Sequence, residues 1–78
     1  MNIQELRIML RAQPFCPFDI HLADGRSISV NHPEFVGETP SRRIIGVGTP
    51  HGIEVVDLLL VRSLKPRSNG ARRRRPIR

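Results

Sequence analysis

Arginine is the residue type whose number and spacing in this 78-residue sequence point most directly to a chemistry. Six arginines fall within the last twelve residues, 67–78, a segment that contains no acid. The guanidinium group is planar, permanently charged and able to bind a phosphate through two hydrogen bonds. We therefore predict that this tail contacts RNA or DNA. The residues that would do so are Arg67, Arg72, Arg73, Arg74, Arg75 and Arg78.

The charge of the chain is divided unevenly between this tail and the rest. Residues 1–66 carry seven basic and seven acidic side chains, so the formal charge of +6 belongs to the tail. Arg42 and Arg43 could extend the basic surface, although exposed charge at the start of a strand is the ordinary alternative. The tail also has alternatives, since it could aid solubility, attract any polyanion such as an anionic lipid, or have no task.

The side chains that could bind a metal or carry out catalysis form no recognised pattern. His21, His32, His51 and Cys16 are the soft metal ligands, and none of them has the short spacing of a zinc site. Cys16 has no adjacent base and no third group to orient one, as an activated nucleophile requires. We predict a protein that is not an enzyme, with no metal, no cofactor and no evident small-molecule substrate.

The single cysteine and the hydropathy of the chain bear on its location. One thiol cannot form an intramolecular disulfide, which is typical of a reducing compartment. The longest apolar run, Leu58 to Val61, is too short to span a bilayer. Glu5 and Arg7 interrupt the region where a signal peptide would be apolar. We expect a cytoplasmic protein without a membrane span.

The elements that must position these residues begin with a predicted helix over residues 3–12. Asn2 can cap this helix, and Glu5 stands three residues later, as in a capping box. Apolar side chains recur on one helical face. Pro14 disfavours helical backbone at the residue before it, so the helix should end there.

Alternating apolar residues next predict two strands joined by a hairpin turn. A two-residue loop would set the apolar side chains of one strand against polar side chains of the other. A three-residue loop that ends at Gly25 instead pairs Ile20 with Ile28 and Phe18 with Val30. Because a slip of one residue moves a whole face, we predict the longer loop, with Gly25 at positive φ.

The rest of the chain completes a fold that is mainly β with one N-terminal helix (α+β). After a connection over residues 31–42, strands are predicted at 43–48, 53–56 and 60–64. This order best fits a small five-stranded, partly open barrel of the SH3-like or Sm-like type, since closure removes sheet edges. A helix packed on a plain five-stranded meander is the alternative. The single compact domain then spans residues 1–66, and the arginine-rich tail is expected to be disordered.

Three stretches of the sequence carry a family resemblance: PFCPFDIHLADGR (14–26), HPEF (32–35) and EVVDLLLV (54–61). They resemble a family of short, functionally uncharacterised bacterial proteins over residues 3–65, so the resemblance implies no activity, and the tail lies outside it. The helix and the LADGR hairpin are also similar to the Sm-like RNA-binding fold. That second similarity concerns the fold, and a fold does not imply a function.

The aliphatic block at residues 53–64 could exceed what so small a core buries. Leu58, Leu59 and Leu60 are consecutive, whereas a strand hides only alternate side chains on one face. One of these leucines could therefore be exposed for a partner or a second copy. Alternatively, a short turn at Asp57 rotates all three inward.

Two hypotheses about function follow from these patterns. The leading one is a non-enzymatic binding module, as a monomer or an oligomer, whose folded domain positions the basic tail against nucleic acid. The separation of a neutral domain from a +6 tail motivates it. The alternative is a protein-interaction or assembly subunit, such as a homo-oligomer, that uses the 53–64 block while the tail is incidental.

Overall fold

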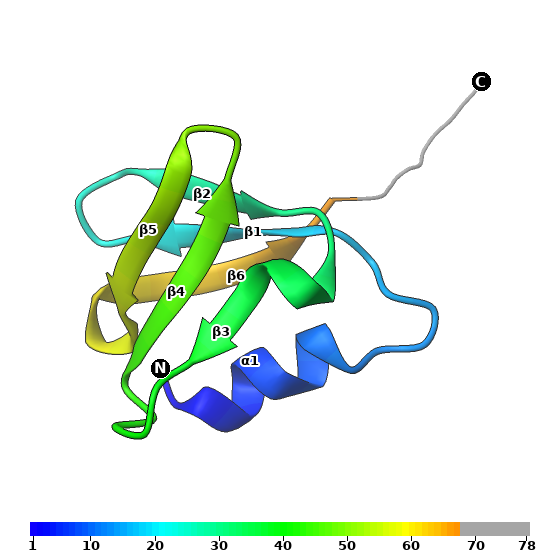
Figure 1. Cartoon of the computed structure of the whole chain (residues 1–78), viewed down its shortest axis with the longest axis horizontal. Helices are drawn as coiled ribbons and strands as arrows, with labels where there is room; N and C mark the ends of the chain where they lie inside the picture. The colour runs from blue at the N-terminus through cyan, green and yellow to red at the C-terminus, as the bar shows by residue number, and fades with distance from the viewer. Residues whose placement is uncertain (68–78) are drawn as a thin grey trace.

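The computed structural model describes residues 1–67, where one helix precedes six strands and two short 3-10 turns (Figure 1). The chain is therefore mainly β with one N-terminal helix, as the sequence predicts. The elements are α1 (Ile3–Leu10), β1 (Phe18–Leu22), β2 (Ser27–Val30), η1 (Pro33–Phe35), β3 (Val36–Glu38), β4 (Ile44–Thr49), β5 (Gly52–Asp57), η2 (Leu58–Leu60) and β6 (Val61–Pro66).

Helix α1 begins where its capping residue predicts. The Oδ1 atom of Asn2 accepts a hydrogen bond from the backbone N–H of Glu5 at 3.2 Å, which satisfies one of the donors that a helix start leaves free. The helix ends at Leu10, before the predicted end at residue 12. The side chains that it buries are Ile3 and Leu6.

The first hairpin has the predicted register. Phe18 lies opposite Val30 and Ile20 lies opposite Ile28, which confirms the three-residue loop. Gly25 has a φ of 94°, a backbone conformation that residues with side chains rarely adopt. β6 pairs with the other side of β1, so the first sheet has the order β2-β1-β6.

A second three-stranded antiparallel sheet has the order β3-β4-β5. β3 lies inside the predicted connection, so the prediction of five strands is wrong. Its three residues include Gly37 and show no apolar alternation that a sequence could reveal. The chain reaches this position because η1 turns it away from β2, after which Val36 lies opposite Val47 of β4.

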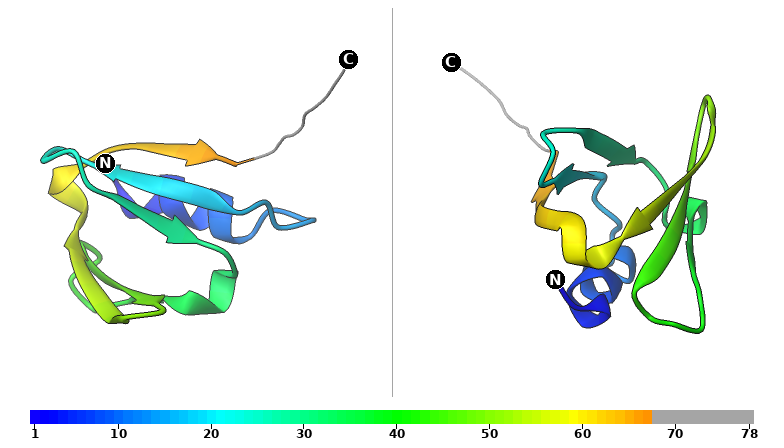
Figure 2. Two further views of the ribbon diagram at one scale, coloured as in Figure 1. Left: turned by 90° about the horizontal axis from the view of Figure 1, so that it is seen from above. Right: turned by 90° about the vertical axis from the view of Figure 1, so that its left-hand side faces the viewer.

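The two three-stranded sheets lie on either side of the core and do not form a closed barrel. η1 connects the first sheet to the second, and η2 connects β5 back to β6. In Figure 2, α1 lies across one side of the space between the sheets. The buried core residues are Ile3, Leu6, Phe18, Ile20, Leu22, Ile28, Val30, Ile45, Val47, Val56, Leu58 and Val61.

Candidate functional site

The η2 turn decides which part of the aliphatic block is exposed. The Oδ1 atom of Asp57 accepts a hydrogen bond from the backbone N–H of Leu59 at 2.9 Å and so caps the turn. Leu58 points into the core and is 2% exposed, while Leu59 and Leu60 are 65% and 54% exposed. Of the three leucines predicted as a partner interface, one belongs to the core and two lie on the surface. The turn does not rotate all three inward.

β5 adds two more exposed aliphatic side chains to these leucines. Ile53 and Val55 are 77% and 72% exposed. Their neighbours across the ladder with β4 are Gly48 and Gly46, which have no side chains to cover them. We call the four exposed residues the β5 edge surface: Ile53, Val55, Leu59 and Leu60.

The backbone of β5 is also unpaired on one side. Among the described residues, β5 is hydrogen-bonded to β4 alone. The N–H of Leu58 donates to the carbonyl of Arg43 at 2.8 Å. Because bonded pairs alternate along an antiparallel ladder, every second residue from Leu58 back to Gly52 bonds to β4. The N–H and C=O groups of Ile53 and Val55 therefore face the open edge.

A hollow of about 310 Å³ lies between the β5 edge surface and the tip of the first hairpin. Val55 and Leu60 line one side of it, and Ala23 and Asp24 line the other. The backbone N–H of Ala23 donates to the carbonyl of Leu60 at 2.7 Å, which holds the hairpin tip in place. Sequence reasoning missed this contact, because no local signal joins residues so far apart in the chain.

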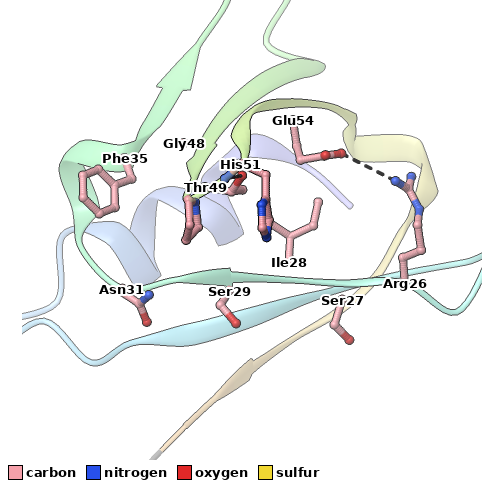
Figure 3. A pocket seen from close by; sticks show the side chains of 11 residues that line it. Arg26, Ser27, Ile28, Ser29, Asn31, Phe35, Gly48, Thr49, His51 and Glu54 are labelled. Carbon is pink, nitrogen blue, oxygen red and sulfur yellow. Dashed lines mark hydrogen bonds and ion pairs between the residues drawn. The ribbon is translucent and has the colours of Figure 1, made fainter.

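A larger open groove, with a volume of about 870 Å³, lies between β2 and the tip of the β4–β5 hairpin (Figure 3). Phe35, which is 45% exposed, lines it together with Ser29 and Thr49, whose hydroxyl groups donate to Asp19 and to the carbonyl of Gly52. Arg26 and Glu54 form an ion pair of 3.5 Å at one end. The groove therefore offers an exposed aromatic ring, and its lining acid is already paired.

Arg67 is held against the folded domain. Its backbone N–H donates to the carbonyl of Pro17 at 2.9 Å, and its guanidinium lies 3.1 Å from Asp19. The guanidinium also donates to Asn31, which lines the large groove. Arg67, the last described residue, therefore lies beside that groove. The rest of the predicted tail lies outside the described residues, including Arg72, Arg73, Arg74, Arg75 and Arg78.

Arg43 is engaged in an intramolecular ion pair. Its Nε and Nη2 atoms donate to the carboxylate of Asp57, at a shortest distance of 2.8 Å. This guanidinium, followed by the N–H of Leu59, holds the pKa of Asp57 below its ordinary value. Arg42 is exposed and has a φ of 59° in the preceding turn. Of the two arginines predicted to extend the basic surface, Arg43 already has an acidic partner.

The candidate metal ligands lie apart. Within residues 1–67, no group of three His, Cys, Asp or Glu side chains could hold a metal ion. The Nδ1 atom of His21 is 3.0 Å from the hydroxyl of Ser27, and the ring of His32 stands edge-on to Phe35, with centroids 5.2 Å apart.

No protein-family model, curated protein or solved structure matches this chain. In the part that the structure describes, no helix is long and apolar enough to cross a membrane. Side-chain exposure, backbone pairing and charge are therefore the features that bear on the function of this protein.

Proposed function

We propose that this protein is a non-catalytic binding module that docks an extended protein segment along β5. The observation that carries the proposal is the β5 edge surface, where exposed aliphatic side chains accompany unpaired backbone groups. An open sheet edge of this kind can accept a further strand. The added strand satisfies the backbone groups, and its contacts with the side chains give specificity.

Two other sheet edges support the proposal by contrast. β6 carries Arg62, Lys65 and Pro66, and charged residues and proline discourage strand addition at an edge. β3 has only three residues. β5 has six residues, no proline and an uninterrupted register with β4. The two acids of β5, Glu54 and Asp57, are each paired with an arginine of the same chain. β5 is thus longer than β3 and, unlike β6, has no proline.

The size of the surface sets the expected strength of docking. Fully burying one Val, Leu or Ile side chain contributes about 1.5–3 kcal/mol. The four residues of the β5 edge surface are about two thirds exposed on average, so covering them contributes about 4–8 kcal/mol in total. Association itself costs about 4 kcal/mol or more. The complex is therefore expected to be reversible, and covalent capture is the appropriate test.

The test places a photo-crosslinking phenylalanine analogue at Val55 in the full chain, in living cells. Ile8 is the matched control site, because its exposed fraction of 71% on α1 equals that of Val55 within one per cent. We expect protein adducts from position 55 and few from position 8. Equal adduct yields from the two positions would refute docking along β5.

Contact with nucleic acid through the tail is a second candidate function, because the net positive charge lies in the tail and Arg67, the first residue of the tail, lies beside the large groove. Residues 1–66 have no net charge, and Arg67 reaches Asn31 at the groove wall. Phosphates would bind the arginines beyond residue 67, while a base could stack on Phe35, as unpaired bases do on aromatic rings. The order of helix and strands also suggests a partly open SH3-like or Sm-like barrel, a likeness of fold that several functions share.

The nucleic-acid candidate is tested by comparing the full chain with a chain that ends at Arg67. This end point keeps the ion pair of Arg67 with Asp19, so only the remaining five arginines are lost. If all five bind DNA phosphates, log K falls with log salt at a slope of about −4.5. Equal binding and equal slopes for the two chains would exclude the tail as the contact.

A further inference from the structure

We propose that the segment docked along β5 is β5 of a second copy of this chain, paired antiparallel about a two-fold axis at Val55. This inference rests on the docking function above and names its partner. It would make the protein an isologous homodimer, in which each copy contributes the same surface. Joined in this way, the two β3-β4-β5 sheets would form one continuous six-stranded sheet.

The unpaired backbone groups define the geometry of such a dimer. Ile53, Val55 and Asp57 are the alternate residues whose N–H and C=O groups face away from β4. A two-fold axis at Val55 places Val55 opposite Val55 of the second copy. It also places Ile53 opposite Asp57 of the second copy, and the reverse. Each unpaired donor on one edge then meets an acceptor on the other.

Charge selects this register over its nearest competitor. An axis at Glu54 would set two Glu54 carboxylates opposite each other, and like charges directly opposite are destabilising. An axis at Val55 instead sets Glu54 opposite Val56 of the second copy. Glu54 is already paired with Arg26, and Asp57 with Arg43. No unpaired charge on β5 is therefore brought against a like charge.

The same register accounts for the exposed leucines that follow β5. In this register Gly52 lies opposite Leu58 of the second copy, where the η2 turn begins, so Leu59 and Leu60 of that copy lie near Pro50 and His51. These two residues form the tip of the β4–β5 hairpin, which projects away from the rest of the domain in Figure 2. The hairpin tip of each copy would thus cover the exposed leucines of the other, and the whole β5 edge surface would be used.

A second copy explains the surface better than an unrelated strand does. A two-fold rotation at Val55 sets Val55 against Val55, pairs the free backbone groups of β5 with one another and brings no like charges together. The core of the domain contains only twelve buried residues, and self-association is a common way for so small a domain to bury more apolar surface. A foreign strand is the competing occupant, and the experiments below separate the two.

The first experiment measures the mass of the full chain in solution over a concentration series, by sedimentation equilibrium. We expect reversible association to twice the chain mass of 8.9 kDa. Val55→Lys places two like charges at the axis and should weaken dimerisation by about a hundredfold. Ile8→Lys, at the equally exposed position on α1, should leave it unchanged. Circular dichroism checks that both variants fold. A monomer at every concentration overturns the inference, as does equal weakening by both variants.

The second experiment tests the register with thiols. In a Cys16→Ser background, Val55→Cys should form a disulfide-linked dimer under mild oxidation, because opposite residues in a bonded antiparallel pair have Cα atoms about 5.5 Å apart. Ile53→Cys should not, because the two copies of residue 53 would be offset by about 13 Å along the strands. Crosslinking at 53 but not at 55 overturns the proposed axis.

The crosslinking assay in cells separates failure of this inference from failure of the docking function. Adducts from position 55 that have twice the chain mass support the homodimer. Adducts of other masses, with a monomeric purified protein, overturn the homodimer and leave docking along β5 intact. Equal yields from positions 55 and 8 overturn both.

Discussion

Alanine in place of Leu58 tests the division that η2 makes between core and surface. Leu58 is 2% exposed, whereas Leu59, the next residue and the same side chain, is 65% exposed. Truncating a buried leucine costs about 2–5 kcal/mol, and a domain of this size has a stability of only about 3–5 kcal/mol. At about 4–8 °C per kcal/mol, Leu58→Ala should lower the Tm by at least about 8 °C. Leu59→Ala should change the stability by no more than about 0.5 kcal/mol.

The assay is thermal unfolding followed by far-ultraviolet circular dichroism, because the chain has no Trp or Tyr for intrinsic fluorescence. Dilute protein is used so that association through β5 contributes little to the Tm. At higher concentration, Leu59→Ala should begin to lower the Tm relative to the wild type, since association stabilises the folded state. Equal losses from the two substitutions in dilute protein would refute the assignment of Leu58 to the core and Leu59 to the surface.

Substitutions at three further positions test local features of the fold. The lowered pKa of Asp57 means that its ion pair with Arg43 stabilises the protein above the ordinary carboxyl value of 3.8 and is lost as the pH falls through the folded-state pKa. Asp57→Asn should therefore lower the Tm at neutral pH and flatten its decline below about pH 4, and an unchanged acid profile would contradict this. Gly25→Ala places a side chain at a φ of 94° and should cost about 1 kcal/mol by urea unfolding; an unaltered midpoint would argue against the positive φ at this position. Asn2→Ala removes the cap on the N–H of Glu5 and should also cost about 1 kcal/mol, while Asn2→Asp, which keeps an acceptor, should not.

The elements that sequence reasoning predicted well depend on local interactions. The cap of α1 by Asn2 requires only residues within one turn. The register of the first hairpin follows from a single condition, that apolar side chains face apolar side chains, and this condition distinguishes a three-residue loop from a two-residue loop. In the same way, a sequence can show that three consecutive leucines cannot all lie on one face of a strand.

The pairing of β3 with β4 could not be read from the sequence. It depends on how η1 redirects the chain, and the short segment around Gly37 carries no periodic signal of its own. The position of Arg67 is a similar case. Its charge assigns it to the basic tail, but the pairing of β6 with β1 carries it to Asp19 and Asn31.

The sequence by itself determined where the basic charge lies and which residues face each other in the first hairpin. It also indicated that the 53–64 block holds more aliphatic side chains than a small core needs. Only the tertiary structure decided which of those side chains remain exposed. Leu58 is buried because η2 turns it toward the core, and Leu59 and Leu60 are left outside. Val55 lies at an open edge because no other described strand pairs with β5. Exposure and edge position depend on contacts between segments distant in the chain, and local sequence patterns do not encode such contacts.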